Sequence, residues 1–171
     1  MFYIFVEGYF DEYYFTRIFF ASTLVCFIQY ASLKPEKVND YLKSIKKIPN
    51  SDYLFFGDSD GLSINEKTDF LITKYKEIDH HKVFIVQYEI ESWYYAGVCE
   101  SDCKKLRLTK FEYSTNSLTK EGLDAKMPKP SERAVILSKL IELYSIELAE
   151  MRNDSLKLFI DYIRNNCFES E

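Results

Sequence analysis

Glycine and proline are scarce in this chain, which has 5 glycines and 4 prolines among 171 residues. Long flexible linkers are rich in such residues, so an arrangement of separate domains on floppy connections is disfavoured. Hydrophobic residues make up 47% of the sequence, which excludes disorder as the default and allows one domain with a real core. Because Tyr and Phe number 14 each, we expect that core to be built largely from rings.

The sequence also lacks an excess of basic residues, a long hydrophobic run and a secretion signal. Its net charge is −5, which argues against a dedicated non-specific DNA-binding protein, although not against an enzyme that meets phosphates through metal ions. The most apolar window, residues 18–30, is shorter than the roughly 20 residues that a membrane span needs. The start, Met1 to Val6, has no basic residue, and Glu7 interrupts it, so a signal peptide is not indicated and a cytoplasmic protein is expected.

The cysteines and histidines do not form a familiar metal-binding motif. Cys99 and Cys103 are one helical turn apart, and His80 and His81 are adjacent, but neither pair has the usual close spacing of a zinc site. We therefore expect reduced, buried free thiols rather than structural zinc. The cysteines are Cys26, Cys99, Cys103 and Cys167.

The first half of the chain alternates between short apolar runs and helical patterns. Strands are expected at residues 2–6, 23–30, 53–56 and 82–87, and helices at 10–20, 35–48 and 63–78. This alternation is typical of parallel βαβ units, and continuous apolar strands are typical of a sheet covered on both faces. The sequence therefore predicts an α/β fold, with a four-stranded parallel Rossmann-like sheet in the order 2-1-3-4 and helices on both faces.

The second half has a weaker, mainly helical pattern. Short helices are expected after residue 91 and over 100–107, a long loop over 109–129, and helices over 131–144, 147–152 and 154–165. We expect residues 1–98 to form the α/β core and residues 99–171 a helical extension packed on the same domain. Trp93, Tyr94 and Tyr95 are expected to pack in the core rather than to form a platform for stacking bases.

Acidic residues follow three of the four expected strands. Ligands of open α/β sheets bind beyond the carboxyl ends of the strands, where these acids gather, and packing alone gives no reason for carboxylates there. The residues are Glu7 after the first strand, Asp11 in the first turn of the helix that follows that strand, Asp58 and Asp60 after the third strand, and Glu89 and Glu91 after the fourth. Carboxylates that crowd together favour a cation between them, and magnesium or manganese prefers such oxygen ligands. The alternative for Asp58 to Gly61 is a solvated turn, because Asp and Gly are favoured in any turn.

Glu7-Gly8 after one strand and Asp58-Ser59-Asp60 after another resemble the Toprim domain of topoisomerases, primases and nucleases. Val6-Glu7-Gly8 followed by Asp11-Glu12 is similar to the first motif of OLD-family (overcoming lysogenization defect) nucleases. Residues 89–93, Glu-Ile-Glu-Ser-Trp, resemble a motif of small stand-alone Toprim-like proteins, as do, more weakly, Ser138-Lys139 and residues 149–153.

The resemblance implies a role for each acidic residue. Glu7 would be a metal ligand or general acid/base, and Asp58 and Asp60 would be metal ligands. Asp11 would hold a second metal, and Glu89 would be a further ligand, ahead of Glu91. Two metals would stabilise the attacking and leaving oxygens in phosphodiester cleavage.

These observations lead to one main hypothesis and two alternatives. The main one is a Mg2+- or Mn2+-dependent nuclease or phosphodiester-transfer protein acting on DNA or RNA, with a separate ATPase chain, since a Walker-type loop is missing. A basic cluster would hold the phosphate backbone: Lys104, Lys105, Arg107 and Lys110. The alternatives are a non-catalytic binding or regulatory subunit, and phosphotransfer or phosphohydrolysis on a small molecule.

Overall fold

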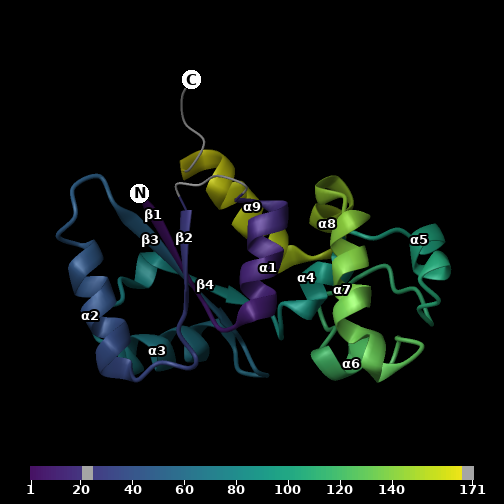
Figure 1. Ribbon diagram of the computed structural model, residues 1–171, viewed down its shortest axis with the longest axis horizontal. Coiled ribbons are helices and arrows are strands. Elements are labelled where there is room, and N and C mark those ends of the chain that lie inside the picture. The colour runs from purple at the N-terminus through teal and green to yellow at the C-terminus, as the bar shows by residue number, and fades with distance from the viewer. Residues whose placement is uncertain (21–24, 167–171) are drawn as a thin grey trace. The chain divides into compact units, whose positions relative to one another are not determined.

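The computed structural model describes residues 1–20 and 25–166 (Figure 1). The chain divides into two compact units, Met1–Val86 and Gln87–Glu171. This division falls before residue 99, where the sequence analysis placed the start of the helical extension. The first two residues of the second expected strand, 23–30, and Cys167 lie outside the described residues.

The first unit contains the predicted parallel sheet. Its elements are β1 (Phe2–Val6), α1 (Tyr9–Ile18), β2 (Val25–Gln29), α2 (Pro35–Ile45), β3 (Asp52–Asp58), α3 (Ile64–Lys74), the 3₁₀ turn η1 (His80–Lys82) and β4 (Val83–Val86). The strands run in the order β2-β1-β3-β4, and each neighbouring pair is parallel. The predicted α/β class, strand order and parallel pairing are confirmed.

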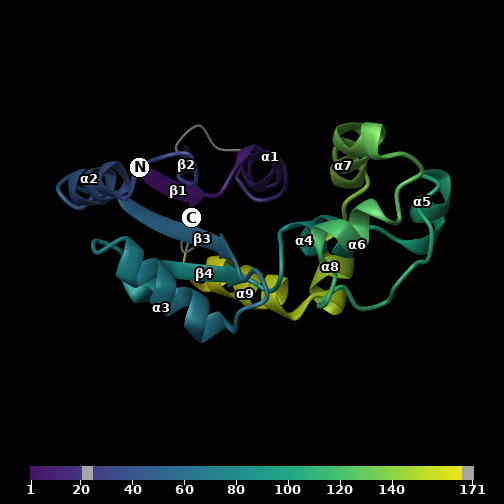
Figure 2. The same ribbon diagram turned by 90° about the horizontal axis from the view of Figure 1, so that it is seen from below.

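Aromatic side chains fill both faces of this sheet, as the composition predicts. On one face, Phe5 stacks on Phe55 with ring centroids 5.2 Å apart, under the buried stripe of α2, which begins at Val38. On the other face, the ring centroid of Phe15 in α1 lies 4.3 Å from that of Phe56. Figure 2 shows α2 and α3 on one side of the sheet and α1 on the other. Because both faces are covered, the strands are apolar throughout rather than alternating.

Two element boundaries differ from the prediction in ways that bear on the site. Strand β3 runs on to Asp58 instead of ending at Phe56, because Gly57 and Asp58 continue the ladder with β4 opposite Ile85 and Val86. Asp58 is therefore a strand residue rather than part of the following turn. Helix α3 begins at Ile64 and ends at Lys74, shorter than the expected 63–78.

The second unit is helical in the residues that the structure describes. Its elements are α4 (Glu91–Ala96), α5 (Glu100–Lys105), α6 (Lys120–Asp124), the 3₁₀ turn η2 (Pro130–Glu132), α7 (Arg133–Glu142), α8 (Ile146–Arg152) and α9 (Asp154–Asn166). Trp93 is buried, and its ring nitrogen donates a hydrogen bond to Oγ of Ser155 at 2.9 Å. Tyr94 and Tyr95 are also buried, which confirms the expectation of core packing.

A buried arginine joins the loops of the second unit. Arg152 at the end of α8 is 2% exposed, and its guanidinium donates hydrogen bonds to five backbone carbonyls. The acceptors are Tyr95, Ala96, Val98, Glu112 and Tyr113. Arginine suits this position because its planar head carries five N–H donors. Arg152 therefore ties the middle of the segment 106–119, which has no helix or strand, to the end of α4.

Candidate active site

Two acidic residues stand at the carboxyl ends of the adjacent strands β1 and β3. Glu7 follows the last residue of β1, and Asp58 is the last residue of β3. The backbone N–H of Asp58 donates a hydrogen bond to Oε1 of Glu7 at 3.2 Å, so the Glu7 side chain reaches across to the neighbouring strand. The structure thus brings these two predicted residues together, at the edge where open α/β sheets bind ligands.

Tyr30 fixes the same carboxylate from the end of β2. Its hydroxyl donates to Oε1 of Glu7 at 3.1 Å, and its ring is buried against Phe55. Burial first, and then the negative charge of Glu7, raise the pKa of Tyr30 well above its ordinary value, so the phenol keeps its proton and stays a donor. Sequence reasoning missed Tyr30, because one tyrosine among 14 carries no distinguishing signal.

Gly57 makes room for this contact. A Cβ built on Gly57 would lie 3.3 Å from the hydroxyl of Tyr30, 3.6 Å from Oε1 of Glu7 and 3.0 Å from Cδ1 of Leu71. Tighter approaches than about 3.4 Å require neighbouring atoms to move, and packed interiors resist such movement. Glycine at this position therefore allows Tyr30 and Glu7 to meet over the backbone of β3.

A buried lysine lies among the acids. The side chain of Lys67 is 7% exposed, and its ammonium lies 2.5 Å from Oδ2 of Asp60 and 3.8 Å from Oε1 of Glu7. Lysine is rarely buried unless its charge is paired, and here two carboxylates supply the pairing. The structure thereby brings Asp60 and Glu7 together through a residue that the sequence analysis did not select.

The local sequence explains why Lys67 points inward. Ser63 and Glu66 form a capping box that starts α3, with Oγ of Ser63 accepting the Glu66 N–H at 3.2 Å and Oε2 of Glu66 accepting the Ser63 N–H at 2.9 Å. This start fixes the helix phase, so that Lys67 and Leu71, one turn apart, share the buried face. Lys67 could have been found from the sequence, because Ser63 is recognisable as the N-cap of the helix and Lys67 lies one turn before the apolar Leu71.

Asp60 is presented by a tight turn rather than by a strand. Its φ is +51° and that of the following Gly61 is +83°, and Asp and Gly are the residues that best tolerate this left-handed region. The preceding Ser59 is buried, and its N–H donates to the carbonyl of Val86 at 3.0 Å. A turn is thus present at Asp60 and Gly61, whereas Asp58 belongs to β3 and the Asp60 side chain is bound to Lys67.

Asp11 has a structural contact of its own. Its Oδ2 accepts a hydrogen bond from the N–H of Gly8 at 2.9 Å, which caps the first turn of α1 and suits the helix dipole. A role for Asp11 as the ligand of a second metal stays a prediction.

Glu89 and Glu91 belong to the second unit and have different partners. Glu89 accepts a hydrogen bond from the N–H of Lys120, and burial raises the pKa of Glu89, although that hydrogen bond opposes the shift. Glu91 is buried and pairs with Arg133, which also lies 3.5 Å from Asp124. Arg133 offsets the charge of Glu91, while Glu89 accepts from a neutral amide. The predicted ranking of Glu89 above Glu91 as a metal ligand remains open.

The predicted basic cluster is exposed in the second unit, and two of its cations are paired locally. Lys104 lies 2.8 Å from Glu100 and Lys105 2.7 Å from Asp102, all within α5. Surface pairs of this kind are weak, so both side chains remain available to a stronger anion. The other two members, Arg107 and Lys110, follow α5 with positive φ angles of 58° and 48°.

Glu7 and Asp60 are gathered around the ammonium of Lys67, and Asp58 is joined to them through its backbone N–H, which donates to Glu7. Over residues 1–20 and 25–166, the group of three or more potential ligand residues whose atoms all lie within 4.8 Å of one another is Asp79, His80 and His81. We use the name acid–lysine site for Glu7, Asp58, Asp60, Lys67 and the supporting Tyr30. This site is the main polar feature at the carboxyl edge of the sheet among the described residues.

The fold and this site define an α/β protein with a parallel four-stranded sheet and ionisable groups at its carboxyl edge. No protein-family model, curated protein or solved structure matches the chain. Within the described part of the chain, each helix is too short or too polar to cross a membrane. The thiols of Cys26, Cys99 and Cys103 are free, but only that of Cys103 is buried, whereas Cys26 is exposed and Cys99 is partly exposed.

Proposed function

We propose that the acid–lysine site carries out divalent-metal-dependent phosphodiester chemistry on nucleic acid, with Glu7, Asp58 and Asp60 holding Mg2+ or Mn2+. The observation that carries the proposal is the buried ammonium of Lys67 between Asp60 and Glu7, whose Oε1 also accepts the N–H of Asp58, at the carboxyl edge of a parallel sheet. Packing alone does not call for such an arrangement, because burying charges is costly. The resemblance of Glu7-Gly8 and Asp58-Ser59-Asp60 to Toprim motifs supports the same assignment.

The donor set fits a hard cation. Carboxylate oxygens are the ligands that magnesium and manganese prefer, and the three described contacts of Glu7 all go to Oε1, which leaves Oε2 for a ligand. A bound ion would stabilise the charge on the attacking or leaving oxygen of a phosphodiester. Tyr30 would orient Glu7, and Lys67 would bind a non-bridging phosphate oxygen as a point charge. Glu89 and Asp11 are the further ligands proposed, and the basic residues after Cys103 the contacts to the nucleic-acid backbone.

The same lysine favours a second candidate function. Because its ammonium already offsets the charge of Glu7 and Asp60, the site does not require a metal ion to fold. A non-catalytic subunit that keeps this fold and binds a separate ATPase chain would be built in this way. Hydrolysis of a small phosphate ester is the third candidate.

Cleavage assays distinguish these candidates. The tag-free protein is incubated with plasmid DNA, single-stranded DNA, RNA and a small phosphomonoester, each with Mn2+, Mg2+ or EDTA. We expect metal-dependent cleavage of a nucleic acid that Asp58→Asn reduces by at least about a hundredfold, in line with loss of one catalytic electrostatic contact. Asp40→Asn, an exposed carboxylate on α2, serves as the control and should cleave like the wild type.

Each of the other results has a defined meaning. Hydrolysis of the phosphomonoester alone would replace nucleic acid by a small-molecule substrate. No cleavage of any substrate, together with co-purification of an ATPase, would favour the subunit. Cleavage that persists in Asp58→Asn would show that the activity comes from a contaminant or another site.

A further inference from the structure

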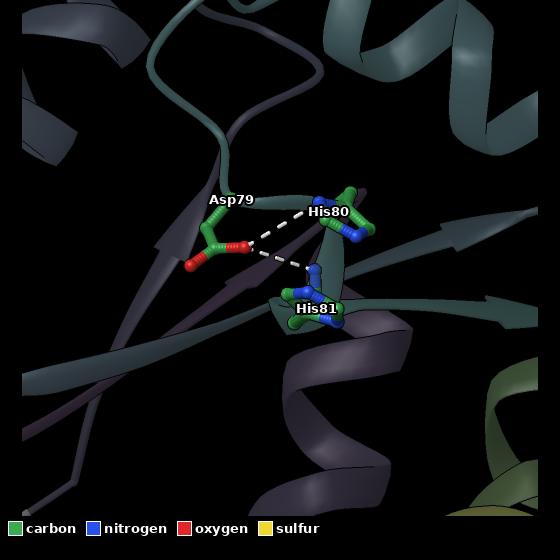
Figure 3. Close-up of side chains that lie close together, drawn as sticks. All are labelled: Asp79, His80 and His81. Carbon is green, nitrogen blue, oxygen red and sulfur yellow. Dashed lines mark hydrogen bonds and ion pairs between the residues drawn. The ribbon is translucent and has the colours of Figure 1, made fainter.

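The turn that leads into β4 gathers both histidines of the chain beside an aspartate. The chain has 2 histidines, and His80 and His81 directly follow Asp79. One ligand atom from each of the three side chains lies within 4.8 Å of the others. Figure 3 shows the two imidazole rings and the Asp79 carboxylate close together at the turn, with dashed lines from the Asp79 oxygen to the His80 ring and to the backbone nitrogen of His81.

The backbone of this turn is held from both sides. The N–H of Asp79 donates to the hydroxyl of the buried Tyr53 at 2.8 Å, and the N–H of Lys82 donates to the carbonyl of Asp79 at 3.0 Å. Oδ1 of Asp79 accepts the N–H of His81 at 3.0 Å. A fixed backbone lowers the entropy lost when a ligand orders the side chains, so the three donors are partly preorganised.

The donors select the class of ion. His80 Nδ1 lies 3.8 Å from Oδ1 of Asp79, and the centroids of the two imidazole rings are 3.6 Å apart. Imidazole nitrogen suits zinc, copper and nickel, whereas magnesium prefers oxygen donors alone. Two imidazoles and one carboxylate are a common zinc donor set that leaves one position for water or an external ligand. We propose that Asp79, His80 and His81 form a surface site for one zinc-class divalent ion.

A groove lies beside the turn and shares two of its three ligand residues. It has a volume of about 640 Å³ and runs between α3 and the turn, with Asn65, Thr68 and Asp69 on the helix side and Asp79 and His80 on the other. Ile72 and Ile78 also line the groove, and Asn65 and Thr68 can hydrogen-bond to a water held by the ion. Such outer partners are what steady the ligands of known metal sites.

The site is independent of the function proposed above. Asp79 precedes β4, and Tyr53 lies near the start of β3, so the turn lies at the amino edge of the sheet, whereas the acid–lysine site lies at the carboxyl edge. The two sites also take different ions, because one offers oxygen donors alone and the other adds imidazole nitrogen. Failure of either assignment leaves the other standing.

Calorimetric titration of the full-length, tag-free protein with Zn2+, under reducing conditions, tests the site. We expect one ion per chain, at least tenfold weaker binding in His80→Ala and in His81→Ala, and loss of binding in the double variant. Asp58→Asn and Asp40→Asn should bind Zn2+ like the wild type, and Mg2+ should not compete. Circular dichroism and thermal melts of each variant confirm that it is folded, since the imidazoles are exposed.

A second measurement identifies the donor atoms. The free thiols are the competing ligands, and Co2+ in place of Zn2+ gives intense thiolate-to-metal absorption only when sulfur is bound. We expect weak d–d bands that vanish in the double histidine variant. Strong thiolate absorption, undiminished Zn2+ affinity in the double variant, or no binding at millimolar Zn2+ would each overturn the assignment.

Discussion

The ammonium of Lys67 lies 2.5 Å from Oδ2 of Asp60, and the Lys67 side chain is 7% exposed whereas that of Asp60 is 57% exposed. The pair therefore joins a buried cation to a solvated anion. The buried ammonium of Lys67 cannot be solvated in place of its carboxylate partners, while the exposed carboxylate of Asp60 can bind water or a metal ion instead of Lys67. This asymmetry fixes the direction of the effects expected at the acid–lysine site.

Replacing Lys67 should separate stability from metal binding. In Lys67→Met, Glu7 and Asp60 lose their counter-charge, so we expect a stability lower by about 1–3 kcal/mol in EDTA. Mn2+ should bind about tenfold more tightly, because a positive charge that repels it over a few ångströms is gone. Urea unfolding in EDTA and calorimetric titration with Mn2+ measure the two effects. Lys76→Met, an exposed position after α3, should change neither, and weaker Mn2+ binding in Lys67→Met would contradict the site.

Mn2+ or Mg2+ should raise the thermal midpoint of the wild type. A ligand that binds only the folded state stabilises it by roughly 2.7 kcal/mol at a hundredfold excess over its dissociation constant. Asp58→Asn should abolish this response and stay folded, while Asp40→Asn should respond like the wild type. Thermal melts with and without about 10 mM ion, which is a hundredfold excess for a site with a dissociation constant of about 0.1 mM, provide the measurement. A flat wild-type response would remove the metal from the proposal.

Gly57→Ala should destabilise the first unit and disturb Tyr30. The added methyl would meet the Tyr30 hydroxyl and Leu71 at 3.3 and 3.0 Å, and overpacking of this kind costs about 1–3 kcal/mol. Gly8→Ala is a suitable control, because a Cβ there meets nothing within 4 Å. Urea unfolding of both variants should show the larger loss at Gly57. Equal losses of unfolding free energy in the two variants would mean that the side chains around Gly57 move to accommodate the added methyl.

The free energy of unfolding of the wild type, compared with that of Glu89→Gln, should fall as pH rises. Burial raises the pKa of Glu89, so the folded chain holds this proton more tightly than the unfolded chain, where the pKa is about 4.3. The stabilising effect of the protonated form is complete below the unfolded pKa and is lost as pH rises through the folded one. Urea midpoints of both proteins across the acid-to-neutral range measure the change. If Glu89 binds metal, Mn2+ should reduce this difference in stability at neutral pH. A wild type that becomes more stable relative to Glu89→Gln as pH rises would contradict the raised pKa of Glu89.

Arg152→Lys should strongly destabilise the second unit. Lysine has three N–H donors against five, so at least two of the buried carbonyls now bound by Arg152 lose their partner. Each orphaned buried group costs roughly 1–3 kcal/mol, which gives a loss of about 2–6 kcal/mol. Urea unfolding measures it, with Arg164→Lys, a half-exposed surface pair with Glu150, as the control. A loss below that of the control would show that water replaces the guanidinium.

The sheet was predictable because its signal is local. Apolar runs such as Tyr53 to Phe56, each followed by a helical pattern, specify buried parallel strands without knowledge of any contact. The meeting of Glu7 with Asp58 followed from the same rule, since the carboxyl ends of parallel strands share an edge.

The rest depended on contacts that no local pattern encodes. Lys67 reads as one more charge on a solvated helix, because its burial depends on the phase that Ser63 and Glu66 impose. Tyr30 is selected only by the space above Gly57. Helix α6, inside the stretch expected to be a loop, is a single capped turn in which Thr119 accepts the N–H of Gly122 at 3.1 Å, too short for its periodicity to be visible.

The carbonyls bound by Arg152 also constrain the order in which the chain acquires its structure. They lie 39 to 57 positions earlier in the sequence than the arginine, so during synthesis they leave the ribosome well before their donor. Until α8 arrives, those groups must stay hydrated, and the segment that carries them cannot settle into a dry interior. The second unit is therefore expected to close late and in one concerted step, with chaperones and proteases able to reach residues 95–113 on the nascent chain until then.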